Sequence, residues 1–235
     1  MKRLTIAIDG PAGAGKSTVA RRLASLLGYT YIDTGAMYRA VAWKAIQEGI
    51  PLEDTEGLTR LAQTIQIAFA PGDNGEQRVL VDGEDVTQAI RTPEVSALSS
   101  PVSAVSGVRR ALVTQQQAMG DGGGVVMEGR DIATVVLPNA DVKIFLTASE
   151  RERARRRWLE LSQRGQTISI EEVLQQIRER DARDSSRADS PLRQAHDSIY
   201  LDSDGVPVEG MSPVEGVVNR ILAICRERGE RSLCG

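Results

Sequence analysis

LTIAIDGPAGAGKST, residues 4–18, is the stretch that decides the fold. Its apolar first part, residues 4–8, predicts a short buried strand, and the residues from Lys16 to Leu27 are compatible with a helix. Between them, residues 10–17 match the pattern G-x-x-x-x-G-K-[ST] in full. A strand, a glycine-rich loop and a helix in this order are the context that the pattern requires. The sequence therefore predicts a phosphate-binding loop (P-loop) near the N-terminus.

The residue types in this loop suit the phosphates of a nucleotide. Gly10, Gly13 and Gly15 allow the backbone to curl so that its N–H groups point inward. The start of the helix adds the positive end of its dipole. Lys16 supplies a charge for the β- and γ-phosphates, and Ser17 supplies a hydroxyl ligand for Mg²⁺. We expect the nucleotide to be bound by Gly10, Pro11, Ala12, Gly13, Ala14, Gly15, Lys16, Ser17 and Thr18, with Ser17 as the metal ligand.

Length and composition narrow the class of protein. The chain has 235 residues, of which 41% are hydrophobic, and this suits one α/β domain with excursions. The net charge of −3 argues against a general nucleic-acid binder. Cys225 and Cys234 match no metal-binding spacing and predict no disulfide. With no signal peptide and no apolar run that would span a membrane, we expect a cytoplasmic monomer that acts on small molecules, not on nucleic acid or membranes.

Apolar segments alternate with helical segments along most of the chain. Strands are expected near residues 4–8, 29–33, 125–127, 142–146 and 198–202. Five strands separated by helices predict a parallel sheet with helices on both faces. Ligands bind such sheets at the carboxyl ends of the strands. Residues 9–18, 33–39, 128–131 and 202 should therefore meet at one edge of the sheet.

Two segments fall outside this alternation. Residues 66–90 carry short apolar runs separated by polar turns, which predict a small antiparallel insert. Residues 151–187 are rich in charged side chains, and Ser149 and Ser169 each begin a capping-box pattern. This composition is typical of a solvated, movable helical arm. A third capping box at Ser212 predicts the C-terminal helix.

Several arginines follow predicted strands, where phosphoryl transfer needs cations around the phosphate oxygens. Arg39 could hold an accepting phosphate or could be an exposed helix residue. Arg130 ends a buried strand, where a charge is costly unless it faces a ligand. The charged run 178–187 could instead be a helix face whose charges pair with one another. We expect no catalytic role for His196 and a packing role for Trp43, Trp158 and Cys225; either Glu128 or Asp131 could hold Mg²⁺ through water.

Taken together, these motifs resemble the bacterial cytidylate kinases, which are nucleoside monophosphate kinases of the P-loop superfamily. The resemblance is carried by IDGPAGAGKST, DTGAMYRA, DGEDVTQAIRTPEVS, VRRAL, EGRDIATVV, ADVKIFLTAS and IRERDARDSSR. It implies transfer of a phosphoryl group from ATP, with Mg²⁺, to CMP or dCMP. It also implies a P-loop core (1–34, 108–150 and 188–235), a monophosphate-binding region (35–107, with the insert at about 66–90) and a lid (151–187).

The resemblance also implies roles for individual residues. Arg39, Arg130 and Arg187 resemble the clamp on the CMP phosphate, and Ser100, Arg109 and Asp131 resemble the residues that read cytosine. Arg180 and Asp184 resemble contacts to the sugar or the phosphate. Lid arginines among Arg153, Arg155, Arg156 and Arg157 should reach the transferred group. The implied catalytic set is Lys16, Arg130, Arg187, Arg153 and Arg157.

Two positions depart mildly from the family pattern. Thr34, also expected to bind substrate, stands where Ser is common, and Glu128 stands where Asp is common.

Two alternative functions remain at this point. One is a kinase for another monophosphate, such as UMP or AMP. The other is a switch protein that binds nucleotide without catalysis.

Overall fold

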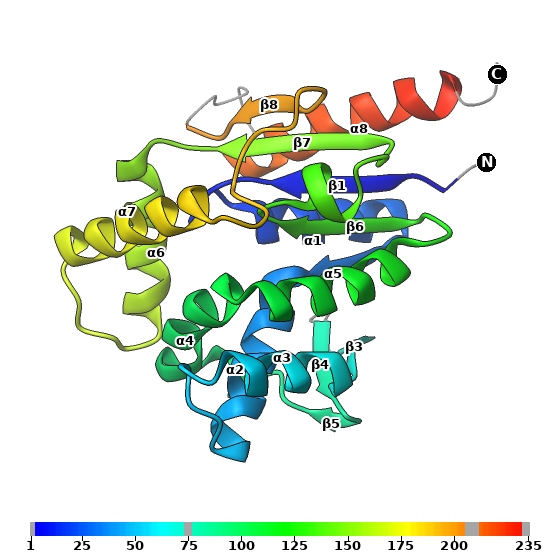
Figure 1. Ribbon diagram of the computed structural model, residues 1–235. Helices are drawn as coiled ribbons and strands as arrows, with labels where there is room; N and C mark the ends of the chain where they lie inside the picture. Colours follow the sequence, from blue (N-terminus) through cyan, green and yellow to red (C-terminus); the bar gives the residue numbers. More distant parts are fainter. Residues whose placement is uncertain (1–2, 73–76, 205–211, 232–235) are drawn as a thin grey trace. The chain divides into compact units, whose positions relative to one another are not determined.

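The computed structural model describes residues 3–72, 77–204 and 212–231 (Figure 1). The chain divides into two compact units. The first comprises Met1–Tyr31 and Gly122–Gly235, and the second comprises Ile32–Asp121. The expected division into core, monophosphate-binding region and lid is a different one and stays a prediction.

The larger sheet has five strands in the order β2-β6-β1-β7-β8, and all of them except β2, which spans the boundary between residues 31 and 32, lie within the first unit. The strands are β1 (Thr5–Asp9), β2 (Thr30–Asp33), β6 (Val125–Gly129), β7 (Val142–Thr147) and β8 (Ile199–Asp202). β1 pairs in parallel with β6 and β7, and β7 pairs in parallel with β8. Strand β6 is buried over its whole length, as expected of a strand inside a parallel sheet. The predicted fold class is confirmed.

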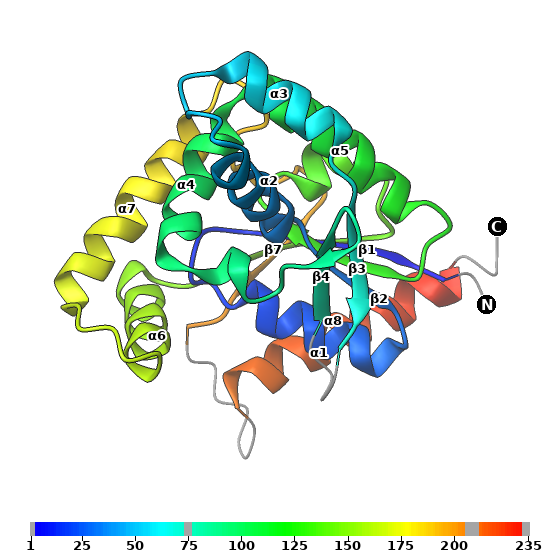
Figure 2. The same ribbon diagram turned by 90° about the horizontal axis from the view of Figure 1, so that it is seen from below.

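Helices α1 (Lys16–Leu27) and α8 (Pro213–Arg231) pack side by side against one face of this sheet (Figure 2). Val19 and Leu23 of α1 and Ile221 of α8 join Ile6 and Ile144 in one buried cluster. The spacing of these side chains on the helices follows the helical repeat, which explains why the helices form here. Cys225 lies in the same cluster, and burial raises the pKa of its thiol to about 11. Its predicted core position is confirmed, whereas Cys234 lies outside the described residues.

Helices α6 (Glu150–Gln163) and α7 (Ile170–Ser186) pack on each other around a small core of their own. Trp158 packs against this core, and its Nε1 donates to the Ile168 carbonyl oxygen over 3.0 Å. The capping box at Ser169 is complete. At Ser149 only half of the expected box forms, because the Glu152 carboxylate accepts from Arg155 and Arg156 instead. The movement expected of this helix pair stays a prediction.

The second unit contains helices α2 (Thr34–Glu48), α3 (Thr55–Thr64), α4 (Pro93–Ala104) and α5 (Ser106–Gly120), with a short 3-10 helix η2 (Ala89–Arg91). Strands β3 (Ile67–Pro71), β4 (Gln77–Val81) and β5 (Glu84–Asp85) form an antiparallel sheet. The predicted insert is therefore confirmed, although its turn at 73–76 lies outside the described residues. Trp43 packs against the core of this unit, as expected. In the part of the chain that is described, no helix is long and apolar enough to cross a membrane.

Candidate active site

The P-loop connects the end of β1 to the start of α1, as the motif predicts. Gly10, Gly13 and Gly15 have φ angles of 151°, 76° and 88°, a region that L side chains rarely adopt. A Cβ atom at Gly10 would lie 1.9 Å from the carbonyl oxygen of Leu146. The loop can therefore pass β7 at this point only because residue 10 is glycine.

Lys16, the first residue of α1, is 6% exposed, and its Nζ donates to the carbonyl oxygen of Pro11 over 2.8 Å. Burial and, next, the positive charge of Arg130 lower the pKa of Lys16 to about 7, against the opposing effect of Glu128. The hydrogen bond of this buried amine is to a carbonyl oxygen of its own loop, an acceptor that a phosphate oxygen could replace. Ser17 is half-buried on the same first turn.

Asp9, the last residue of β1, supports the segment that follows β6. Its two carboxylate oxygens accept from the backbone N–H groups of Ile132 and Ala133 over 2.9 and 2.8 Å. These residues begin a short π-helix, η3 (Ile132–Val136), which the sequence did not predict. Burial raises the pKa of Asp9 to about 6 despite the two N–H groups, and the charge of Asp131 adds to the rise.

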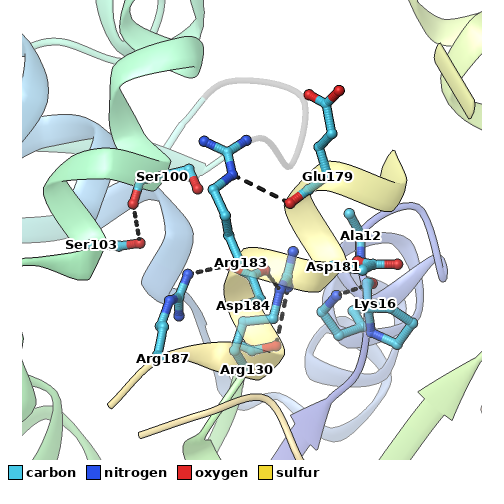
Figure 3. Close-up of polar contacts among 12 residues, drawn as sticks. Ala12, Lys16, Ser100, Ser103, Arg130, Glu179, Asp181, Arg183, Asp184 and Arg187 are labelled. Atoms are coloured by element: carbon cyan, nitrogen blue, oxygen red, sulfur yellow. Dashed lines mark hydrogen bonds and ion pairs between the residues drawn. The ribbon is translucent and has the colours of Figure 1, made fainter. Parts of the chain in front are cut away.

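A buried cluster of charges, formed by Arg130, Asp184 and Arg187, lies in the same unit. Asp184, which is 1% exposed, accepts from Nε of Arg130 over 2.8 Å and also from Arg187. Figure 3 shows Asp184 with both arginines. Burial alone would raise the pKa of Asp184, but Arg130, Arg187 and Arg180 outweigh burial and lower it. The structure thus brings four sequence-predicted residues together, three from the end of the arm and one from the end of β6.

The arm arginines differ in what they contact. Nη1 of Arg153, a 5%-exposed residue, donates to the Ala12 carbonyl oxygen of the P-loop over 3.0 Å and pairs with Asp181. Arg156 donates to the Ala14 carbonyl oxygen over 3.5 Å and to Ser203 over 2.9 Å. Arg157 pairs with Glu160, and its side chain is 38% exposed. Arg155 pairs with Glu152 on the helix surface. Arg153 and Arg156 thus contact the P-loop, whereas Arg157 pairs along its own helix.

Glu128, at the end of β6, accepts a hydrogen bond from the Tyr31 hydroxyl over 2.5 Å. It is 3% exposed, and Asp131 is 4% exposed. Among the described residues, no group of three or more His, Cys, Asp or Glu side chains could hold a metal ion.

In the second unit, Arg39 donates from Nη2 to Asp33 over 2.8 Å. Asp33 also caps α2, because its carboxylate accepts from Ala36 N over 3.0 Å. Burial alone would raise the pKa of Asp33, but its contacts with Arg39 and Ala36 lower it. Thr34, the first residue of α2, is buried. Arg39 is not an exposed helix residue, because only 21% of its side chain is exposed.

The second unit also holds two of the expected base-reading residues. Arg109, 2% exposed on α5, donates to the Ser103 carbonyl oxygen over 3.2 Å, and its guanidinium carbon lies 5.4 Å from the centre of the Tyr38 ring. Ser100, on α4, is 8% exposed. Its Oγ is buried and has no hydrogen-bond partner within residues 3–72, 77–204 and 212–231. A buried hydroxyl of this kind is available to a ligand.

Sequence reasoning missed four residues that organise these groups: Asp9, Asp33, Tyr38 and Asp181. Asp9 and Asp33 each directly follow or end a predicted strand, and that position was a usable signal. Tyr38 lies four residues after Thr34 on a helix, and nothing in its spacing pointed to Arg109. Asp181 stands in a run of alternating charges where many pairings are equally favoured. The side chain of His196 is 94% exposed, and its expected lack of a catalytic role stays a prediction.

Sequence comparisons with known proteins identify one family. A family profile described as Cytidylate kinase matches residues 6–227. A cytidylate kinase from Pelotomaculum thermopropionicum is 54% identical over 222 residues, which cover 94% of this chain and 97% of that protein. A bifunctional pantoate ligase/cytidylate kinase from Synechococcus sp. (strain JA-3-3Ab) is 52% identical over 233 residues, 98% of this chain, and the chain spans 42% of that relative's length. A solved gluconokinase from Sinorhizobium meliloti 1021 aligns over 100% of this chain and 98% of its own, with 17% identity and a TM-score of 0.46.

Proposed function

The chain belongs to the cytidylate kinase family, and from this premise we propose that it transfers the γ-phosphoryl group of ATP to CMP or dCMP. The products are CDP or dCDP and ADP. One observation carries the proposal: Lys16 on the P-loop and the buried cluster of Arg130, Asp184 and Arg187 belong to the same unit, and Arg130 lies near enough for its charge to lower the pKa of Lys16. Both groups of cations suit phosphates.

The P-loop is assigned to ATP. Its inward-curled backbone and the N-terminus of α1 suit the β- and γ-phosphates, and Lys16 would exchange the Pro11 carbonyl oxygen for a phosphate oxygen. Mg²⁺ supplies charge neutralisation on the phosphates when it is bound. The donor set fits this ion, because Mg²⁺ keeps several waters and needs few protein ligands. Ser17 would hold it, with substrate oxygens and water as the other ligands.

The arginines at the end of β6 and on the arm are assigned to the accepting phosphate and the transferred group. Arg130 and Arg187 are held in place by Asp184, so their donors are fixed before a substrate arrives. Arg39 is assigned to the CMP phosphate and is held by Asp33. Arg180, Arg153 and Arg157 are assigned to the closed state. Direct in-line transfer needs no covalent intermediate with the enzyme, and exclusion of water would suppress ATP hydrolysis.

Selection of cytosine is assigned to Ser100, Arg109 and Asp131. An arginine donates to N3 and O2 of cytosine, and a hydroxyl and a carboxylate accept from its amino group. Uracil presents the opposite pattern at these positions and would leave the buried groups unpaired. The buried Ser100 hydroxyl supports this assignment. The relatives are named cytidylate kinases, which favours cytosine over the uracil alternative.

A panel assay tests the proposal. ATP with Mg²⁺ is incubated with CMP, dCMP, UMP or AMP, and ADP release and the diphosphate product are measured. We expect rapid formation of CDP or dCDP and slower turnover of UMP and AMP. Equal or faster turnover of UMP would contradict the cytosine assignment. The absence of any CMP-dependent ADP release would instead favour the nucleotide-binding switch.

A further inference from the structure

Asp181 on α7 contacts the backbone of the P-loop directly. Its Oδ1 accepts from the N–H of Ala12 over 3.2 Å (Figure 3). Its Oδ2 accepts from Nη1 of Arg153 over 2.5 Å. Nη1 of Arg153 also donates to the carbonyl oxygen of Ala12 over 3.0 Å. Asp181 and Arg153 therefore engage both polar groups of one P-loop residue.

This contact is buried and closely fitted. The side chain of Arg153 is 6% exposed and that of Asp181 is 20% exposed. A second donor of Arg153, Nε, is held by the carbonyl oxygen of Ala148 over 3.0 Å. At Gly13 a Cβ atom would lie 3.0 Å from Cβ of Arg153, so α6 lies directly against the loop. The arrangement is thus fixed by several contacts and not by one surface ion pair.

Ala12 lies inside the glycine-rich loop, whose backbone N–H groups cradle phosphate in this motif. A carboxylate on such an N–H takes the place of a phosphate oxygen. Two anions cannot both accept well from one N–H, and they repel each other at this separation. A nucleotide that uses this N–H must first displace Asp181.

We propose that Asp181 is a gating residue: without nucleotide, its carboxylate occupies the Ala12 amide and holds Arg153 on the loop, and the incoming phosphates displace both. Displacement frees Arg153 from the Ala12 carbonyl oxygen, so that its guanidinium group turns to the phosphates. Asp181 acts on the reaction through Arg153 and is therefore a positioning residue. The inference rests on the proposed function only for the identity of the nucleotide.

Displacement of Asp181 also reaches the accepting side of the reaction. Asp181 and Asp184 are three residues apart on α7, and residues at this spacing lie on the same face of a helix. Asp184 holds Arg130 and Arg187. Against the lowering effect of burial, Asp184 and, less strongly, Asp181 raise the pKa of Arg130, so displacement of Asp181 changes the electrostatics of the cluster assigned to the CMP phosphate.

The test compares Asp181→Asn with the wild type in equilibrium binding of the non-hydrolysable ATP analogue AMP-PNP with Mg²⁺. We expect the variant to bind about tenfold more tightly, the fold-change for losing one competing charge-assisted hydrogen bond. Its kcat for CDP formation should stay close to that of the wild type, because bound nucleotide displaces Asp181 from Arg153 in both proteins. A merely structural role would weaken binding and kcat together. Equal or weaker binding by Asp181→Asn would overturn the proposal.

Two matched variants separate gating from a general charge effect. Glu179→Gln removes a negative charge from the same helix, where Glu179 accepts from Gln175 near the surface, and should leave the affinity within twofold. Asp181→Glu keeps the charge and should not tighten binding. If Glu179→Gln tightened binding as much as Asp181→Asn, the effect would be one of charge alone and the proposal would fall.

Amide hydrogen exchange of the wild type gives an answer even if Asp181→Asn does not fold. The Ala12 amide should be protected without nucleotide, and fast exchange there would contradict gating. CDP formation by the wild type is measured separately. If Asp181→Asn bound AMP-PNP more tightly but the wild type formed no CDP, the proposed kinase activity would be refuted and gating would stand. If the wild type formed CDP normally but Asp181→Asn bound AMP-PNP with unchanged affinity, gating would be refuted and the kinase activity would stand.

Discussion

Asp184→Asn tests how far the buried charge cluster stabilises the protein. Asp184 is 1% exposed and is paired with two arginines, whose side chains are 17% and 9% exposed. Removal of one partner from a buried ion pair costs about 3–5 kcal/mol, because the remaining charges stay buried without compensation. Since water reaches part of Arg130, we expect the lower end, about 3 kcal/mol. For a chain of this size, that corresponds to a fall in Tm of about 6–12 °C.

The measurement is thermal unfolding of Asp184→Asn, with Glu179→Gln as the control from the same helix. Saturating CMP should raise the Tm of the variant by more than it raises that of the wild type, because a bound phosphate supplies the missing negative charge. A fall in Tm no larger than that of Glu179→Gln would refute the reasoning, since it would mean that the arginines do not need the carboxylate.

The same variant has a defined pH dependence. The folded protein holds the pKa of Asp184 below its ordinary value of 3.8. A carboxylate with a lowered pKa contributes stability above its unfolded pKa, and that stability is lost as the pH falls through the folded pKa. The difference in Tm between wild type and Asp184→Asn should therefore be constant near neutral pH and shrink below about pH 4.

Three further predictions concern the P-loop, the base-reading residues and the β1 carboxylate. At pH 8, the protein should take up a proton when ATP binds, because Lys16, with a pKa lowered to about 7, is largely neutral until a phosphate raises that pKa. Calorimetry in buffers of different ionisation enthalpy measures this proton uptake. The variant Lys16→Met should abolish it. Ser100→Ala should leave Tm unchanged or raise it, since the Ser100 hydroxyl is buried without a hydrogen-bond partner among the described residues. The same variant should raise KM for CMP by roughly 2–12-fold. The control Ser99→Ala removes a hydroxyl that donates to a backbone oxygen, and it should leave KM unchanged. Asp9→Asn should cost about 1–3 kcal/mol of stability near pH 4, because the amide NH2 group cannot accept from one of the two backbone N–H groups that face residue 9. Since the folded pKa of Asp9 is raised to about 6, the wild type should lose stability from about pH 4 to pH 6 while the variant does not, and parallel pH profiles of Tm would count against this assignment.

The sheet and the P-loop were predictable because they depend on local patterns. Apolar runs such as 142–146 contain enough buried side chains to define a strand without knowledge of its neighbours. The glycines of residues 10–15 are required by φ angles that other residues rarely adopt. The insert followed from its polar turns. In each case one segment carries its own signal.

The π-helix at Ile132–Val136 and the contacts of the arm were not predictable in this way. The π-helix follows from two N–H groups held by Asp9, which is more than 120 positions away in the chain. Arg153 is paired with Asp181 across 28 positions, within a region where nearly every helical turn offers another carboxylate. Local spacing favoured pairs along one helix, and Arg157–Glu160 is such a pair. The structure is needed to tell these two kinds of pairing apart.

The acidic residues that the motifs overlooked share one physical role. Lys16 and Arg153 are buried, Arg130 and Arg187 are partly buried, and a buried cation without compensation is strongly unfavourable. In the structure they are held by carboxylates and by carbonyl oxygens of the P-loop. Phosphates are the stronger acceptors for the same donors. A site assigned to two phosphorylated substrates therefore needs internal anions that phosphates can replace, and we propose Asp181, whose carboxylate accepts from a P-loop amide, as one of them.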